Sequence, residues 1–241
     1  MIDEAREWHY DVQPVLAHDA DLTETCQLNL TIQILKKEAS AFAVEESAHD
    51  EPSLYGVTDG KAVGTYLEHR FQQHLIEKYT YVFGSSAKGI DFPELGVDLK
   101  TTSIKQPQSS CPFKSARQKI YGLGYHLLVF VYEKTDDQSR QTGRLKILHT
   151  IFLDSSKTAD FQTTTGLLKI IENQGNTDDL VAFFLERMLL LDEIQAHELA
   201  EEVLREPPQI GYLTISNALQ WRLQYGRAIQ QAGITPGIER L

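Results

Sequence analysis

The chain has 241 residues, and its 23 Lys and Arg residues against 34 Asp and Glu residues give a formal net charge of −11 at pH 7. Hydrophobic residues make up 41% of it, and the longest apolar runs, such as 127–132, are too short to span a membrane. The acidic start, MIDEAREWHYD, is unlike a signal peptide, so we expect a cytoplasmic protein. Cys26 and Cys111 lie far apart, which predicts reduced thiols and no metal-binding cysteine pair.

The first half of the chain shows helical spacing and then extended segments. The spacing of apolar residues predicts one helix at 22–44 and another at 61–78, and the segment 47–53 between them is predicted to be a linker. In the second helix, one face carries Val63, Leu67, Phe71 and Leu75, which we expect to be buried. The segments 89–92 and 97–102 flank a turn at 93–96 and predict a hairpin, and prolines predict an irregular loop at 104–113.

The second half combines two strands with several helices. A short helix is predicted at 115–123, strands at 126–133 and 145–153, and helices at 164–173, 178–204 and 216–232. On the last helix, we expect Leu219, Trp221 and Tyr225 to serve packing rather than base stacking. Helices, then strands, then helices fit an α/β or α+β core of about five strands with flanking helices.

Charge is distributed unevenly along the chain. No acidic residue occurs from 99 to 132, where five basic residues lie, and none occurs from 207 to 238, which holds Arg222 and Arg227. Nucleic-acid binding responds to the local charge of a surface rather than to the net charge. The acidic total therefore does not exclude DNA as a partner.

The segment most informative about chemistry is GIDFPELGVDLKTT at 89–102. On a strand, Asp98 and Lys100 point to one side while Val97 and Leu99 point into the core. Asp91 lies seven residues before Asp98, across the turn, and can come alongside it. Two converging carboxylates suit Mg²⁺, and a lysine beside them can orient a water, which together suit hydrolysis of a phosphodiester.

An Asp-x-Lys tripeptide alone is common by chance, and it would then be a surface ion pair on a strand. The longer context favours a site here. An acidic residue precedes the pair at a fitting distance, a hydrophobic turn separates them, and a basic stretch without acids follows.

This segment resembles the active-site hairpin of the PD-(D/E)XK nucleases, closest to the branch that holds the mismatch-repair nickase MutH and its restriction-enzyme relatives. That branch carries an acid-Phe-Pro-x-Leu-Gly-Val-acid-Leu-Lys-Thr run, and the second acid is Glu in MutH where this chain has Asp98. The segment 64–68 is similar to the family's Gly-x-x-x-Glu helix, with Glu68 as a third carboxylate. The segment 115–119 is similar to its Arg-x-Lys segment, with Lys119 as a second basic catalytic residue.

The resemblance, which spans residues 61–133, implies a type II restriction enzyme with a PD-(D/E)XK core and a central mixed sheet. It implies one or two Mg²⁺ ions at Asp91, Asp98, Glu68 and Leu99. It implies that Lys100 positions the attacking water and that Lys119 stabilises the charge of the transition state. The expected reaction is sequence-specific cleavage of double-stranded DNA that leaves 5′-phosphate ends. The whole chain, 1–241, would then be one nuclease domain, with an N-terminal helical region (1–58), a catalytic core (59–155) and a C-terminal helical region (156–241) that carries recognition elements.

Amide and basic side chains after the hairpin suit contacts with DNA grooves and phosphates. The candidates are Lys105, Gln106, Gln108, Ser109, Lys114 and Arg117. A cognate DNA methyltransferase is expected as a genetic partner. A homodimer and a monomer both stay open. Three alternatives remain: a repair nickase that cuts one strand, an inactive DNA-binding protein on the same fold, and a purely structural α/β protein.

Overall fold

The computed structural model describes residues 28–82, 84, 89–111, 114–216 and 221–241. The helices are α1 (Ile32–Ser47), α2 (Gly60–Ile76), α3 (Arg117–Tyr121), α4 (Phe161–Glu172), α5 (Thr177–Glu186), α6 (Glu193–Arg205) and α7 (Gly226–Gln231), with short 3-10 turns at Pro52–Leu54 and Ser155–Lys157. The strands are β1 (Leu28–Asn29), β2 (Asp50–Glu51), β3 (Tyr79–Thr80), β4 (Val97–Ser103), β5 (Gln108–Cys111), β6 (His126–Asp137), β7 (Thr142–Leu153), β8 (Thr214–Ile215), β9 (Trp221–Gln224) and β10 (Ile238–Arg240). Cys26 and Leu219 lie outside the described residues.

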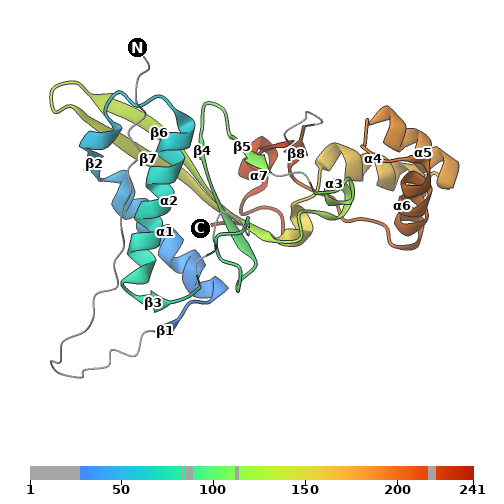
Figure 1. Cartoon of the computed structure of the whole chain (residues 1–241), viewed down its shortest axis with the longest axis horizontal. Helices are drawn as coiled ribbons and strands as arrows, with labels where there is room; N and C mark the ends of the chain where they lie inside the picture. The colour runs from blue at the N-terminus through green and yellow to red at the C-terminus, as the bar shows by residue number, and fades with distance from the viewer. Residues whose placement is uncertain (1–27, 83, 85–88, 112–113, 217–220) are drawn as a thin grey trace, which may run out of the picture.

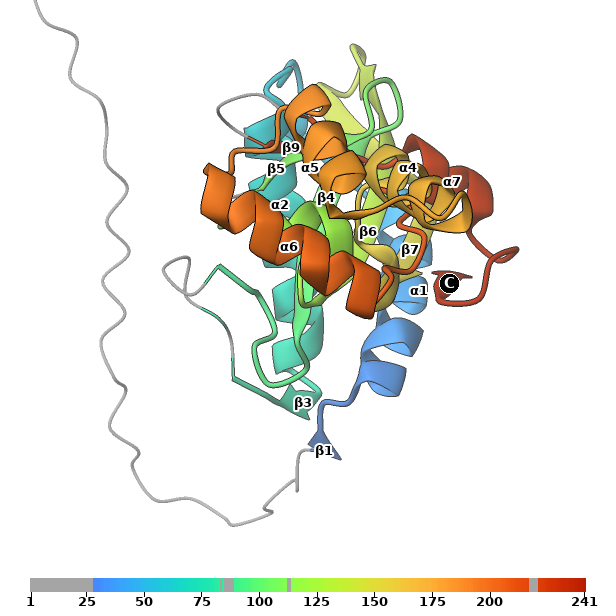
Figure 2. The same ribbon diagram turned by 90° about the vertical axis from the view of Figure 1, so that its right-hand side faces the viewer.

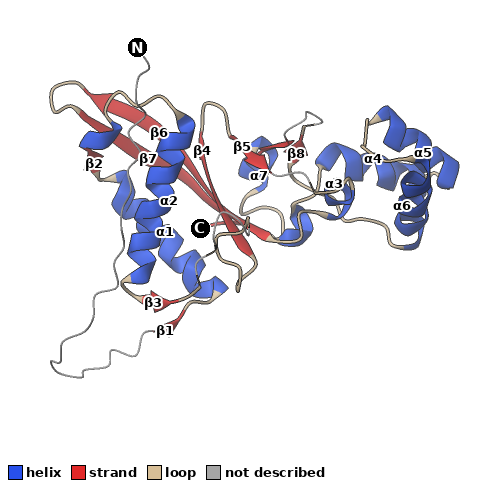
Figure 3. Cartoon of the chain, viewed as in Figure 1, coloured by secondary structure: helices blue, strands red, loops and turns tan. Residues whose placement is uncertain are grey.

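A five-stranded mixed sheet forms the centre of the molecule (Figure 3). Its strands run in the order β10-β7-β6-β4, and β2 also pairs with β7. Strands β4 and β6 are parallel, whereas β2, β6 and β10 each pair antiparallel with β7. The prediction of a mixed α/β fold with about five strands and flanking helices is confirmed.

Strand β6 is central, since it pairs with β4 along one edge and β7 along the other, and its residues 127–132 are buried on both faces. Its side chains alternate: Leu128 and Phe130 enter one hydrophobic cluster, and Leu127 and Val129 enter another. Helices α1 and α2 cover the first face (Figure 1). A small antiparallel sheet, β5-β9-β8, and α7 pack on the second face.

Helix α2 matches its prediction closely. Asp59 caps it by accepting hydrogen bonds from the backbone amides of Lys61 and Ala62. The four predicted apolar residues of its face are all buried in the first cluster. Helix α1, by contrast, begins ten residues later than the predicted start at 22. Leu28–Asn29 pairs with β3 as a strand, and the Thr31 side chain caps the helix.

The C-terminal helices form a third cluster with its own hydrophobic core. Helices α4, α5 and α6 lie together at one end of the elongated molecule, away from α1 and α2 (Figures 1 and 2). The single helix predicted at 178–204 is wrong, because two helices occupy this range. Asp192 begins the second with a reciprocal capping box to Gln195.

Two further predictions were wrong for one reason. The loop predicted at 104–113 contains β5, and the helix predicted at 216–232 contains β9 before α7 begins at Gly226. These two distant segments pair with each other, and that pairing supplies hydrogen bonds that neither segment could make alone. The packing role predicted for Tyr225 is confirmed, because its side chain is fully buried. Within the described residues, no helix is long and apolar enough to cross a membrane.

Candidate active site

A tight turn brings Asp91 back to the edge strand β4. Phe92 and Val97 exchange backbone hydrogen bonds of 2.9 and 3.2 Å, and Gly96 takes a left-handed conformation at φ 60°. The Asp91 carboxylate then accepts a hydrogen bond of 2.8 Å from the backbone N–H of Leu99. Asp91 therefore lies beside Asp98, as the spacing of the two acids predicts.

Asp98 and Lys100 form an ion pair on β4, with Nζ and Oδ2 2.7 Å apart. Asp98 is only 3% exposed. The side chains of Val97 and Leu99 enter the hydrophobic cluster below α1 and α2, so the expected alternation holds. Because the Leu99 side chain carries no ligand atom, only its backbone could contact a metal.

Burial raises the pKa of Asp98 to about 7, and Asp91 acts in the same direction while Lys100 opposes the shift. Burial also raises the pKa of Glu68, and the charge of Asp91 adds to this effect. Burial alone would lower the pKa of Lys100, but the charges of Asp98, Asp91 and Glu68 outweigh it and raise that pKa. The four side chains therefore influence one another's charge. The group contains three carboxyl groups and one amine, so a further positive charge would stabilise its ionised form.

Glu68 reaches this group because α2 packs closely against β4. A Cβ atom on Gly64 would lie 2.8 Å from Thr101 Oγ1, a distance that real Cβ contacts essentially never show. Glycine at 64 therefore permits the close approach. Glu68 lies four residues later, about one helical turn along α2.

We expect Gly64→Ala to lower DNA cleavage about 10- to 100-fold, because a small displacement of α2 moves Glu68 away from β4. Adding Thr101→Ala removes the clashing hydroxyl and should restore much of the rate. Gly60→Ala is the matched control on the same helix, since its Cβ would meet no atom within 4 Å. The cleavage rates of the parent and the three variants are compared under single-turnover conditions. A Gly64→Ala enzyme with the parental rate would show that the close approach is unimportant.

Two of the carboxylates lie where they could bind a divalent cation. Asp91 and Asp98 give a contacting pair of hard oxygen donors, and the raised pKa of buried Asp98 marks a place where a cation would stabilise the charged form. Across the described ranges, no group of three or more His, Cys, Asp or Glu side chains is arranged to hold a metal ion. The Asp91–Asp98 pair fits a divalent cation, and Glu68 is a neighbouring charge rather than a third member of such a group.

The structure does not bring Lys119 into this group. Lys119 is 3% exposed and lies on α3, and its backbone carbonyl accepts a hydrogen bond from the Asp160 amide. Burial lowers the pKa of its amine, while Asp160 opposes and Arg187 adds to that shift. The charges around Lys119 thus belong to the C-terminal helical region rather than to β4, and its catalytic role stays a prediction.

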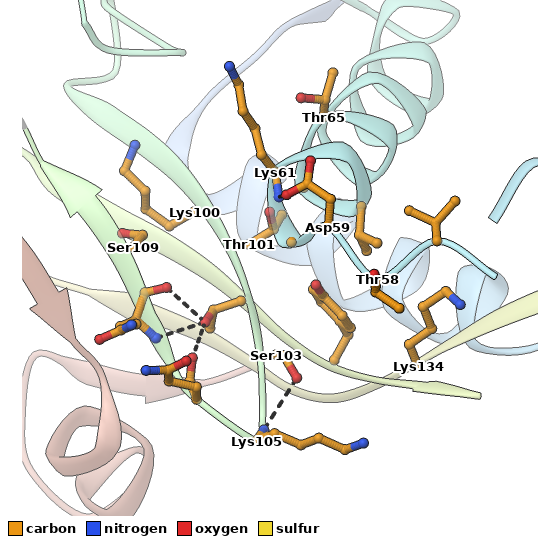
Figure 4. Close-up of a pocket in the computed structure, with 18 of the residues that line it drawn as sticks. Thr58, Asp59, Lys61, Thr65, Lys100, Thr101, Ser103, Lys105, Ser109 and Lys134 are labelled. Carbon is orange, nitrogen blue, oxygen red and sulfur yellow. Dashed lines mark hydrogen bonds between the residues drawn. The ribbon is translucent and has the colours of Figure 1, made fainter. Parts of the chain in front are cut away.

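A cavity of about 1160 Å³ opens beside the four coupled side chains, between α2, β4 and β5 (Figure 4). Lys105, Gln106, Gln108 and Ser109 all line it, four of the six DNA-contacting residues predicted from the sequence. The turn that carries them is fixed by the Thr102 hydroxyl, which donates to backbone oxygens of Gln106 and Gln108 and accepts from the Gln108 amide.

The residues that line this cavity carry a net positive charge, although the whole chain carries a net negative charge. Its charged lining residues are the basic Lys61, Lys100, Lys105, Lys134 and Arg222 and the acidic Asp59, Glu68 and Asp136. Sequence reasoning missed Lys61, Lys134 and Arg222 as residues of this surface. The acid-free stretch around Arg222 was a signal for that residue, whereas only the packing of α2 and β6 beside β4 brings in the other two.

Lys114 and Arg117 lie elsewhere. Both line a separate cavity of about 480 Å³ beside α6. The Arg117 guanidinium pairs with Glu202 at 2.5 Å and lies 4.5 Å from the centre of the Tyr121 ring. A carboxylate already holds this arginine, so its predicted phosphate contact would require breaking an ion pair.

Comparison with known proteins identifies the family of the chain. Residues 29–240 match the family model described as type II restriction enzyme NspV. The chain is 61% identical over 209 residues to the type II restriction enzyme NspV of Nostoc sp. (strain ATCC 29411 / PCC 7524), covering 87% of this chain and 95% of the relative. No solved structure matches. This chain belongs to the NspV family of type II restriction enzymes.

Proposed function

We propose that this type II restriction endonuclease cuts double-stranded DNA with a Mg²⁺-dependent site of the PD-(D/E)XK type on β4. The observation that carries the proposal is the contact of buried Asp98 with both Asp91 and Lys100, of which Lys100 reaches the wall of a net basic cavity. A surface ion pair on a strand would need neither the second carboxylate nor the cavity.

In this mechanism, Asp91 and Asp98 would hold the cation, together with the backbone of Leu99. Bound Mg²⁺ supplies Lewis-acid polarisation of the scissile phosphate and offsets negative charge. Lys100, fixed by its bond to Asp98, orients the attacking water toward phosphorus. Glu68 adds a nearby carboxylate with a raised pKa, which suits it to accept a proton from that water. The expected products carry a 5′-phosphate and a 3′-hydroxyl.

The same cavity supplies the DNA-binding surface of the proposal. Lys61 and Lys105 line it and would contact phosphates of the DNA backbone, whereas Lys134 would first have to leave its ion pair with Asp136. A second copy of the chain is the partner that would cut the opposite strand of a palindromic site. A DNA methyltransferase of the same specificity is the genetic partner that would protect the host's own sites.

Incubation with unmethylated phage DNA tests the proposal directly. We expect discrete fragments with Mg²⁺ and none with EDTA, and end-sequencing should place a 5′-phosphate at one recurring site. Lys100→Gln is the internal control and should cut at least about 100-fold more slowly. Conversion of supercoiled DNA only to nicked circles would instead support the nickase. No cutting combined with retained, salt-sensitive binding would support an inactive DNA-binding protein.

A further inference from the structure

Strands β5 and β9, neighbours in the three-stranded sheet β5-β9-β8, form a ribbon with two chemically different faces. Cys111, Leu223 and Tyr225 point inward and join the second hydrophobic cluster. The alternate residues of the ribbon point the other way and are polar: Gln108, Ser110, Arg222 and Gln224. The antiparallel register places Gln108 opposite Gln224 and Ser110 opposite Arg222. The four polar side chains therefore share one face.

The backbone of the ribbon is held firmly. The Ser109 and Tyr225 hydroxyls are 2.5 Å apart, and the Tyr225 amide donates to the Pro107 carbonyl. Ser216 bonds both backbone groups of Arg222, since its hydroxyl accepts from the Arg222 amide and its own amide donates to the Arg222 carbonyl. Anchored strands of this kind present side chains at fixed positions, which recognition of bases requires.

The polar face opens onto the cavity that contains the active-site lysine. Gln108, Ser110 and Arg222 line that cavity together with Lys100 and Glu68. Arg222 is exposed, and within the described part of the chain no carboxylate forms an ion pair with it. Arg117, in contrast, is paired with Glu202. Arg222 therefore offers its hydrogen-bond donors to a ligand in the cavity.

We infer that the β5–β9 ribbon enters the major groove beside the cut and reads the recognition sequence. This inference rests on the proposed function of the same cavity. The major groove admits a two-stranded ribbon, and its base edges match these side chains. Arg222 pairs with the O6 and N7 atoms of a guanine, and the cross-strand amides of Gln108 and Gln224 pair with adenines.

The test compares Arg222→Ala with Lys105→Ala, a matched control in the same cavity whose expected partner is phosphate. The recognition site is first read from fragments cut by the parent enzyme. Binding is then measured in Ca²⁺ to a duplex with that site and to a scrambled duplex of equal composition. Arg222→Ala should weaken site binding about 10- to 100-fold and leave scrambled binding nearly unchanged, whereas Lys105→Ala should weaken both equally.

Duplexes with 7-deazaguanine sharpen the test, because this analogue lacks the N7 acceptor. Replacement of one particular guanine by this analogue should weaken binding by the parent about tenfold. The same replacement should not weaken binding by Arg222→Ala any further. If Arg222→Ala keeps the parental ratio of site to scrambled binding, or loses both equally, the inference is overturned. A parent that neither cuts nor binds DNA would overturn the proposed function instead. Thermal melting verifies that each variant is folded.

Discussion

Replacing Asp98 with asparagine is expected to reduce DNA cleavage by about 1,000-fold or more while the protein stays folded and binds DNA. Asparagine keeps the size of the side chain but removes the charge that holds Lys100 at 2.7 Å and that would bind the cation with Asp91. Single-turnover cleavage and binding in Ca²⁺ measure the two properties separately. Asp136→Asn is the control, since Asp136 lines the same cavity but pairs with Lys134.

The same substitution has a pH-dependent effect on stability without metal. The folded-state pKa of Asp98 is raised to about 7 from an ordinary value of 3.8, so the folded protein keeps a proton that the unfolded chain has released. The parent therefore loses stability as pH rises from about 4 to about 7, and the loss then levels off. Asp98→Asn lacks this titration, so its melting temperature should gain on the parent's across that window in EDTA. A constant difference between the two proteins would contradict the raised pKa.

Lys119→Met is expected to lower the free energy of unfolding by about 1 kcal/mol and to leave the cleavage rate of the folded enzyme nearly intact. Its amine is buried beside Asp160, and Asp160 organises this region by accepting from the Thr163 amide and hydroxyl and from the Ile215 amide. Removing the cation leaves that buried carboxylate with less compensation.

Chemical denaturation measures the stability, and cleavage is assayed well below the melting temperature. Lys105→Met serves as the exposed control, with an expected change below about 0.5 kcal/mol. The catalytic role that the family resemblance implies for Lys119 predicts the reverse pattern, in which cleavage is lost at unchanged stability. The two measurements together therefore separate a structural from a catalytic lysine.

Short-range patterns were sufficient for the central elements of the fold. The apolar spacing of α2 predicted its buried face, and the continuous apolar run at 127–132 predicted β6. The turn at 93–96 was equally local, although it closes with the single bridge Phe92–Val97 rather than with the predicted hairpin of two strands. A seven-residue spacing across a tight turn placed Asp91 beside Asp98, and strand alternation placed Lys100 on the same side. Such features depend on backbone geometry over a few residues, and the order of residues in the sequence is enough to predict them.

Contacts between distant segments could not be derived in this way. Residues 221–224 lie in a range with spacing compatible with a helix, and they become a strand because β5, more than a hundred residues earlier, pairs with them. Lys119 was correctly placed on a helix, but the position of that helix puts its amine beside Asp160 rather than Asp98. The basic cavity likewise gathers Lys61, Lys134 and Arg222 from three separate elements.

The sequence by itself therefore determined the family resemblance, the mixed α/β class of the fold and the group of two acids and a lysine at the start of β4. The tertiary structure decided which basic residues share the cavity with that group and which face of the β5–β9 ribbon opens onto it. The physical reason is that periodicity records which side of an element is apolar, whereas the meeting of two elements depends on how their apolar sides are buried together.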